Sequence, residues 1–269
     1  MISSTANPHI KFLRSLHLSK NRLASGMFLA EGLKLVGQAF DSHAEIQQLI
    51  FCPELLISDY GQSLIERAKG LGIETLEVNA IVFESLARKD KPQGIAALVK
   101  QNWQRIENIQ LREEKSTWLV IEAIQNPGNL GTVIRTCDAT GVSGLLLLPN
   151  STDPYDPAAV KASMGGAFTV PHYHLSYAQL SHFISANPKL AVVGTSDKAK
   201  QNAFTFTYPK HTLLLIGSER QGLSPELTDL SHQMISIPMT GACDSLNLSV
   251  ATGIILYEIF NQRSGLLRT

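Results

Sequence analysis

From residue 117 onward, the chain alternates short apolar runs with longer stretches in which apolar residues recur every three or four positions. Continuous apolar runs are typical of strands that helices cover on both faces, and the recurring spacing is typical of the covering helices. We therefore expect an α/β fold with a mostly parallel sheet. The predicted strands contain residues 118–121, 145–148, 190–193 and 213–216.

The first hundred residues show a weaker form of the same alternation. The predicted strands there are residues 48–51 and 95–99, and the predicted helices are residues 33–40 and 64–69. This pattern indicates a small α/β domain over residues 1–105, before a larger domain over residues 117–269. Between them, the polar stretch around Arg112 and Glu113 predicts a linker over residues 106–116.

Three glycine-marked turns follow predicted strands and lead into predicted helices. They occupy residues 126–131, 217–224 and 244–253. Ligands of parallel sheets bind beyond the carboxyl ends of the strands, where the first turns of helices offer unpaired backbone N–H groups. The three turns therefore predict one ligand-binding cleft.

The helix after the first turn carries one arginine that does not belong to its core face. The apolar stripe of this helix consists of Leu130, Val133, Ile134 and Cys137. Gly141 marks its end. Arg135 lies about 150° from the centre of the stripe, at about 100° per residue, and so points away from the core. It is either a functional side chain or a solvated arginine paired with Asp138.

The second and third turns leave alternatives open. The second resembles a phosphate-binding P-loop, but Leu223 stands where a lysine is required, which argues against an NTPase. Glu219 suits a cationic ligand or an arginine, or else caps backbone donors. Ser245 and Asn247 are candidate site residues or N-caps of the last helix.

The last helix is apolar around most of its circumference, over residues 248–260. A helix of this kind must be buried on several sides. We expect a second subunit to supply the missing cover.

Composition limits the ways in which the chain can bind a polyanion. It has 269 residues with 23 basic and 23 acidic side chains, so only local patches could attract nucleic acid. One basic patch precedes the first acidic residue, Glu31, and is either a phosphate-contacting arm or a solvated helix face. It contains Lys11, Arg14, Lys20 and Arg22.

Cysteine and histidine usage argues against metal or disulfide chemistry. Cys52, Cys137 and Cys243 are widely spaced without a CxxC pair, which fits a reducing cytoplasm. His172 and His174 are expected on the solvent face of a strand, and we expect no metal site. We also expect no signal peptide and no membrane span, because no apolar run is long enough.

With these residues in view, the chain resembles the SpoU/TrmH family of RNA ribose 2′-O-methyltransferases, within the SPOUT class. The three family motifs match residues 126–141, 214–224 and 237–258. The first part resembles the L7Ae/L30e-like substrate-binding domain of the family, through residues 28–32 and 91–95. The resemblance implies a deep trefoil knot in the second domain. It also implies a homodimer through that domain.

The resemblance further implies S-adenosylmethionine as cofactor and a set of site residues. Cofactor contacts fall on Thr195, Gly217, Ile237 and Leu246. Catalytic positions fall on Arg135, Asn129, Glu219, Ser245 and Asn247. Arg220 is a further candidate for an RNA phosphate contact or a solvated side chain. Arginine is too basic to accept a proton near neutrality, so we favour Arg135 as an electrostatic stabiliser of the reacting 2′-oxygen.

The chain departs from the family pattern in two small ways. Asn126 stands where aspartate is common, and residues 218–220 are Ser-Glu-Arg where small residues are more frequent. The separate first domain favours large-subunit rRNA as substrate over tRNA, and family members that confer antibiotic resistance share this architecture. The alternatives are a tRNA 2′-O-methyltransferase and a non-catalytic RNA-binding protein that retains the cofactor pocket. A dinucleotide-dependent oxidoreductase is disfavoured because no G-x-G-x-x-G follows a first strand.

Overall fold

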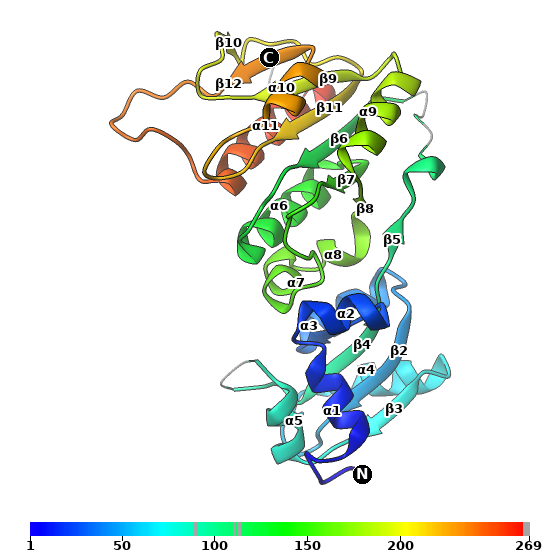
Figure 1. The fold of residues 1–269 in the computed structure, drawn as a ribbon. Helices are drawn as coiled ribbons and strands as arrows, with labels where there is room; N and C mark the ends of the chain where they lie inside the picture. The colour runs from blue at the N-terminus through cyan, green and yellow to red at the C-terminus, as the bar shows by residue number, and fades with distance from the viewer. Residues whose placement is uncertain (89–90, 110, 112–113, 266–269) are drawn as a thin grey trace. The chain divides into compact units, whose positions relative to one another are not determined.

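The chain folds as two compact units, each with its own sheet (Figure 1). Unit 1 comprises Met1–Gln101 with Asp153–Phe168, and unit 2 comprises Asn102–Thr152 with Thr169–Thr269. The computed structural model describes residues 1–88, 91–109, 111 and 114–265.

The chain leaves unit 2 once and returns to it. The sequence places segment 153–168 in the second predicted domain, whereas in the structure this segment packs with the first hundred residues. Within the predicted linker 106–116, residues 110, 112 and 113 lie outside the described residues. The described residues 106–109, 111 and 114–116 belong to unit 2.

Unit 1 is a four-stranded sheet with helices packed against it. The strands are β1 (Met27–Glu31), β2 (Ile46–Phe51), β3 (Glu74–Glu77) and β4 (Ile95–Lys100). The helices are α1 (Pro8–Ser15), α2 (Ser19–Ser25), α3 (Leu33–Asp41), α4 (Asp59–Gly70), α5 (Ala80–Leu86), α7 (Pro157–Ser163) and the start of α8 (Gly166–Thr169). In the order β1-β4-β2-β3, only β2 and β3 are parallel neighbours. The predicted strands and helices of this part are confirmed.

Segment 153–168 completes one side of unit 1. Helix α7 contacts β1. The rings of Phe28 and Tyr155 lie 4.8 Å apart, and the ring of Phe168 lies 6.0 Å from that of Phe28. Phe28 is 1% exposed, so the segment supplies part of the apolar cover of β1.

Unit 2 is built on an eight-stranded sheet in which all neighbouring strands are parallel. In spatial order the strands are β10 (Gln201–Asn202), β12 (Gln233–Ser236), β9 (Ala191–Thr195), β11 (His211–Ile216), β6 (Ser116–Ile121), β7 (Gly144–Leu147), β8 (His172–His174) and β5 (Trp103–Gln104). The predicted parallel α/β sheet is confirmed. Strands β6, β7 and β11 are buried along their whole length, which explains the apolar runs 118–121, 145–147 and 213–216 within them.

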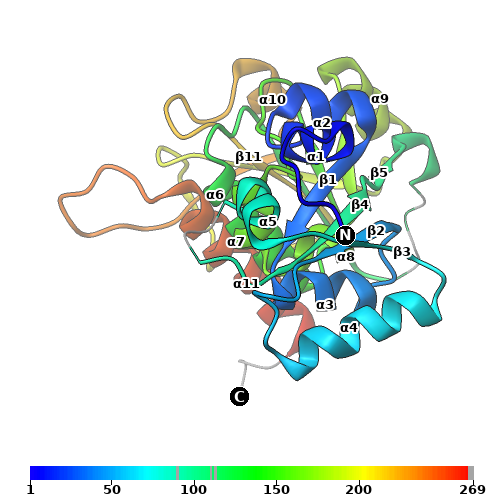
Figure 2. The same ribbon diagram turned by 90° about the horizontal axis from the view of Figure 1, so that it is seen from below.

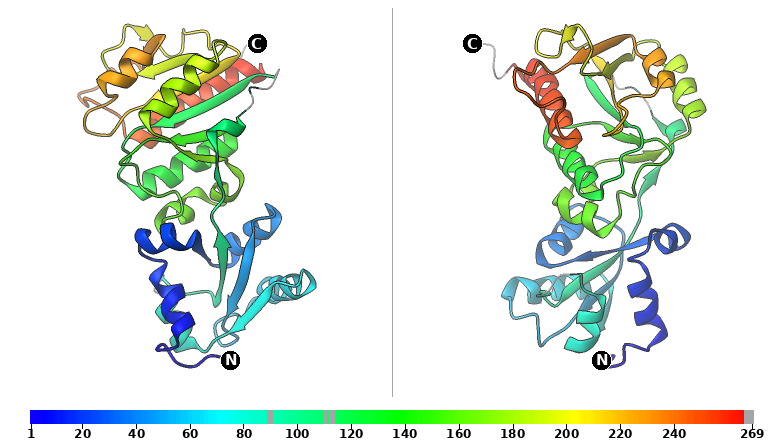
Figure 3. Two further views of the ribbon diagram at one scale, coloured as in Figure 1. Left: turned by 45° about the vertical axis from the view of Figure 1, so that its right-hand side comes forward. Right: turned by 60° about the vertical axis from the view of Figure 1, so that its left-hand side comes forward.

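Helices cover both faces of this sheet. Helices α6 (Pro127–Thr140) and α11 (Leu248–Ser264) share one core with Leu119 and Ile121 of β6. Helices α9 (Tyr177–Ala186) and α10 (Pro225–Leu230) share the other core with Trp118 and Val120. The right-hand view of Figure 3 shows α11 on one side of the strands and α9 and α10 on the other. A short 3₁₀ helix, Ile106–Asn108, follows β5.

Helix α6 forms as its sequence predicts. The Asn126 side chain caps it by accepting from Gly128 N and Asn129 N, and Pro127 occupies its first turn. Gly141 ends it at φ 66°, in the left-handed region. All four residues of the predicted stripe are fully buried.

The expectation for His172 is wrong. Its side chain is 1% exposed, because β8 lies between β7 and β5 and the ring packs near Trp103, with centroids 6.4 Å apart. Burial lowers the pKa of His172 to about 4. His174 is exposed, as expected. Within the described part of the chain, no helix is both long enough and apolar enough to cross a lipid bilayer.

Candidate active site

A cavity of about 550 Å³ lies at the carboxyl ends of β9, β11 and β12 in unit 2. Thr195, Gly217, Ile237 and Leu246, the four residues assigned to the cofactor by resemblance, all line it. The volume falls within the range of about 300–1,000 Å³ that is usual for small-molecule sites. Its position beyond the carboxyl ends of the strands is also the one at which ligands of parallel sheets bind.

Segment 237–247 contributes several of the lining residues. It runs out from β12 and returns to the start of α11 as a long loop, drawn in orange in Figures 1 and 2. Met239, Asp244 and Ser245 of this segment line the cavity. The sequence alternative of Ser245 as an N-cap is wrong, because the N-cap of α11 is Asn247.

The loop after β11 folds back tightly on itself. Ser218 N donates to Gly222 O at 2.9 Å, and Gly222 N donates to Ser218 O at 3.1 Å. Gly217 has no room for a side chain, because a Cβ there would lie 2.0 Å from the carbonyl carbon of Gly222. The loop therefore presents Glu219 and Arg220 at its tip.

Hydrogen bonds join one residue from each of the three turns. Asn129 Nδ2 donates to Glu219 Oε1 at 3.0 Å. Asn247 Nδ2 donates to Asn129 Oδ1 at 3.3 Å, while Asn247 Oδ1 caps α11 by accepting from Ser249 N. The N-cap alternative for Asn247 is therefore confirmed, and the same side chain also contacts Asn129. Glu219 accepts from the Asn129 side chain, at the place where the three turns meet.

Arg135 lies on α6 beyond this network. Its side chain is exposed and is not among the residues that line the cavity. Among the residues that the structure describes, it makes no ion pair, and Asp138 accepts from Thr169 Oγ1 at 2.5 Å. The sequence alternative of an Arg135–Asp138 pair is therefore wrong. A single chain does not place Arg135 in the cavity.

Sequence reasoning missed Glu122, the residue that directly follows β6. Its side chain is 5% exposed and contacts the loop after β11 through Ser224 N, at 2.8 Å. A carboxylate immediately after the apolar run 118–121 was the available signal. Its partner is 102 positions away in sequence, so the contact could not be found from local pattern.

The basic residues of unit 1 divide into two groups. Lys11 and Lys20 are exposed, and Arg14 is partly exposed, so all three are accessible to a phosphate. Arg22 is 1% exposed, and its guanidinium donates to Asp153 Oδ2 at 2.7 Å and to Asp156 Oδ2 at 3.3 Å. The prediction of Arg22 as an RNA contact is therefore wrong.

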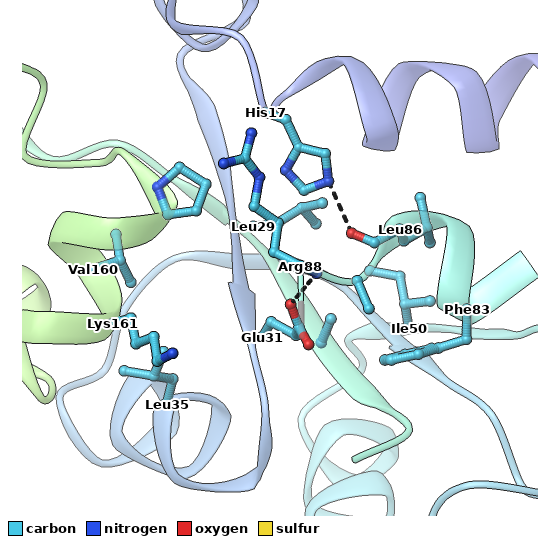
Figure 4. Close-up of a pocket in the computed structure, with 13 residues that line it drawn as sticks. His17, Leu29, Glu31, Leu35, Ile50, Phe83, Leu86, Arg88, Val160 and Lys161 are labelled. Atoms are coloured by element: carbon cyan, nitrogen blue, oxygen red, sulfur yellow. Dashed lines mark hydrogen bonds between the residues drawn. The ribbon is translucent and has the colours of Figure 1, made fainter. Parts of the chain in front are cut away.

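Unit 1 contains a second, much smaller cavity of about 70 Å³, shown in Figure 4. His17 Nε2 donates to Leu86 O at 2.9 Å beside it, and Arg88 N donates to Glu31 Oε2 at 2.9 Å. Burial lowers the pKa of His17. This volume admits only a few water molecules, so the cavity cannot be a cofactor site.

Comparison with protein families places both parts of the chain. A family described as the SpoU rRNA Methylase family matches residues 116–257, and the MRM3-like substrate binding domain matches residues 7–97. The chain is 31% identical over 266 residues to an uncharacterized tRNA/rRNA methyltransferase of Synechocystis sp., which covers 97% of this chain and 94% of the relative.

Two further relatives carry more specific names. The 23S rRNA (uridine(2479)-2′-O)-methyltransferase of Streptomyces viridochromogenes is 29% identical, with 90% of this chain and 85% of the relative covered. The crystal structure of an AdoMet-bound rRNA methyltransferase from Sinorhizobium meliloti matches with a TM-score of 0.87 and 34% identity, over 99% of this chain and 98% of that one. From its motifs, its parallel sheet and these matches, the chain belongs to the SpoU rRNA methylase family.

Proposed function

We propose that this protein transfers a methyl group from S-adenosylmethionine to a ribose 2′-hydroxyl of large-subunit ribosomal RNA. The observation that carries the proposal is the hydrogen-bonded set Glu219–Asn129–Asn247, which joins three turns next to a cofactor-sized cavity. Family membership supports methyl transfer to rRNA, and the Streptomyces viridochromogenes relative is named for 2′-O methylation of 23S rRNA.

The cavity has the chemistry that S-adenosylmethionine requires. Its apolar lining suits a nucleobase, and its carboxylates suit the positive charges of the sulfonium and amino groups. The apolar side chains include Met234, Ile237 and Ile255, and the carboxylates are Asp197, Glu219 and Asp244. Because Gly217 has no side chain, the backbone of the loop itself lines the cavity at this position. The bound cofactor supplies a methyl group on a positively charged sulfur, open to attack by an oxygen nucleophile.

The residues of the chain then position the ribose and stabilise its charge. The 2′-oxygen forms a bond to the methyl carbon as the bond from that carbon to sulfur breaks, and the hydroxyl proton passes to solvent water. An arginine keeps its own proton near neutrality, so Arg135 grips a phosphate beside the target ribose and stabilises the developing negative charge. Asn129 and Glu219 hold the cavity wall in place during the transfer.

A homodimer through unit 2 is part of the proposal. The outer face of α11 exposes Val250 and Tyr257, at 49% and 48%, and a second copy would cover them. Helix α11 packs against α6, which carries Arg135, and we propose that the partner also approaches this arginine. The trefoil knot of the family remains a prediction for this chain.

The first unit has the task of holding RNA. Lys11, Arg14 and Lys20 present positive charge on its accessible surface, and Arg220 does so at the tip of the cavity loop. Such contacts recognise the shape and backbone of a folded RNA. We expect the protein to act in the cytoplasm.

The test is methyl transfer in vitro. Purified protein is incubated with S-adenosylmethionine carrying a labelled methyl group and with unmodified large-subunit rRNA, small-subunit rRNA or tRNA. Label on ribose 2′-oxygens of large-subunit rRNA, located by mass spectrometry of nuclease fragments, is the expected result. Label on tRNA alone would favour the tRNA alternative. RNA binding without any transfer would favour a non-catalytic protein.

A further inference from the structure

We propose that Glu122 is a positioning residue that holds the loop of residues 217–224 in its cofactor-binding shape. This inference rests on the proposed function, because the loop lines the cavity assigned to S-adenosylmethionine. Neither the motifs nor the resemblance assigns any role to Glu122.

Both oxygens of the Glu122 carboxylate are occupied by donors from distant parts of unit 2. Tyr177 Oη donates to Oε1 at 2.6 Å, and Ser224 N donates to Oε2 at 2.8 Å. Tyr177 is the first residue of α9, and Ser224 is the N-cap of α10. The backbone of Glu122 also donates to Ile216 O, the last residue of β11, at 3.0 Å. Glu122 thus connects the end of β6 to both ends of the loop.

These contacts have the geometry of strong, charge-assisted hydrogen bonds. A buried carboxylate is costly unless donors satisfy it, and bonds to a charged acceptor are shorter and stronger than neutral ones. Burial, with the neighbouring Glu122 carboxylate, raises the pKa of Tyr177 to about 12. The phenol therefore keeps its proton at neutral pH and remains a donor.

The loop has two anchors, and Glu122 provides the one at its return end. Its tip is held by Asn129, which donates to Glu219. Its return end is held at Ser224, two positions after Gly222, where the chain closes on Ser218. Without Glu122, the N–H of Ser224 would lose its acceptor, and the segment from Gly222 to Ser224 would lose its tie to the end of β6. The loop would then be held against the cavity at its tip alone.

The first experiment compares Glu122→Ala, Glu122→Gln and the control Asp229→Ala. Glutamine can keep both contacts, because its oxygen can accept from Ser224 N while its amide donates to Tyr177 Oη, which can rotate. Asp229 is an exposed carboxylate on α10, outside the cavity lining. The dissociation constant for S-adenosylmethionine is measured by calorimetry without RNA, together with the unfolding temperature of each variant.

We expect Glu122→Ala to weaken cofactor binding about tenfold or more, because the loop loses a hydrogen bond to a charged acceptor. Glu122→Gln should stay within about threefold of the wild-type affinity, because it keeps the bonds but not the charge. Asp229→Ala should bind as the wild type does. A lower unfolding temperature for Glu122→Ala with unchanged affinity, measured well below that temperature, would overturn the inference.

A second pair of variants tests the single bond to Ser224 N and covers the case in which Glu122→Ala does not fold. Ser224→Pro deletes the N–H donor, and φ at this position is −62°, which proline adopts. Ser224→Ala removes only the side-chain cap of α10, in which Oγ accepts from Leu227 N. We expect cofactor affinity to fall about tenfold from Ser224→Ala to Ser224→Pro. Equal affinities of these two variants would contradict a positioning role.

Coupling to the tip of the loop gives a third measurement. If Glu122 acts through the loop, adding Glu122→Ala to a Glu219→Ala background should weaken binding less than it does in the wild type. Fully additive effects would overturn the inference. A wild-type protein that does not bind S-adenosylmethionine would instead refute the proposed function.

Discussion

At the scale of single residues, the site depends on small polar side chains that make two contacts each. Asn247 caps α11 and donates to Asn129, and Asn129 in turn donates to Glu219. Asn129 and Asn247 are therefore each held at two points, which lowers the number of conformations open to them before a ligand arrives. Arg135 is different, because its side chain is exposed and lies outside the residues that line the cavity.

Replacement of Arg135 by alanine separates catalysis from cofactor binding. We expect Arg135→Ala to lower kcat by about 10²–10³-fold, the size of effect seen when one stabilising donor is removed. The dissociation constant for S-adenosylmethionine should stay near the wild-type value, because Arg135 does not line the cavity. Single-turnover kinetics and calorimetry measure the two quantities, with the exposed Lys189→Ala as control. Loss of cofactor affinity as the main effect would contradict the assigned role.

Replacement of Gly217 by alanine, unlike that of Arg135, should weaken cofactor binding directly. Its Cβ would lie 2.0 Å from the Gly222 carbonyl carbon, so the loop must open. We expect cofactor affinity to fall at least tenfold, since the affected backbone lines the cavity. Gly70→Ala is the matched control, because a Cβ there meets no atom within 4 Å. Calorimetry on both variants checks the prediction, and equal affinities would show that the loop tolerates opening.

At the scale of elements, helix α6 connects folding to the site. Asn126 fixes its first turn, and the same turn presents Asn129 to the loop after β11. The predicted stripe anchors the other face in the core. A shift of this helix would therefore move Asn129 and Arg135 together.

The cap of α6 can be tested directly. Asn126→Ala removes the acceptor for Gly128 N and Asn129 N, and should lower the free energy of unfolding by about 1 kcal/mol. Asn126→Asp keeps an acceptor at the positive end of the helix and should unfold as the wild type does. Urea denaturation measures both. An alanine variant as stable as the wild type would mean that the cap adds nothing here.

Elements with strong apolar patterns could be predicted, and weakly patterned ones could not. The four predicted strands of unit 2 follow from a sheet covered on both faces, and the stripe of α6 follows from burial of one face of the helix. Strand β10 is two residues long and polar, and β12 begins with the exposed Gln233, so no local pattern indicated either. His172 was misplaced because its burial depends on neighbouring strands. The turns of the site were found from glycine and asparagine, whereas Glu122 depends on a distant donor.

At the scale of the whole molecule, Arg22 joins two stretches of sequence in unit 1. Its guanidinium also donates to Leu16 O and His17 O, so α1 and α2 are held with Asp153 and Asp156 of the returning segment. A buried guanidinium with this many acceptors has a structural role, because it holds these segments together.

Replacement of Arg22 by methionine should destabilise unit 1. Breaking a fully buried pair costs about 3–5 kcal/mol, and we expect about 2–3 kcal/mol here because the two carboxylates are partly exposed. Arg14→Met, on a partly exposed side chain, should cost less than about 1 kcal/mol. Hydrogen exchange of β1 amides reports the stability of this unit. Equal protection in both variants would refute the role of Arg22.

The return of segment 153–168 to unit 1 has a consequence for synthesis on the ribosome. Strand β1 lacks part of its apolar cover until Tyr155 and Phe168 have emerged from the exit tunnel. While β6, α6 and β7 are translated, the apolar face of β1 in the newly made first hundred residues therefore remains partly uncovered. An exchange of unit 1 between genes would therefore have to carry residues 153–168 together with the first hundred residues.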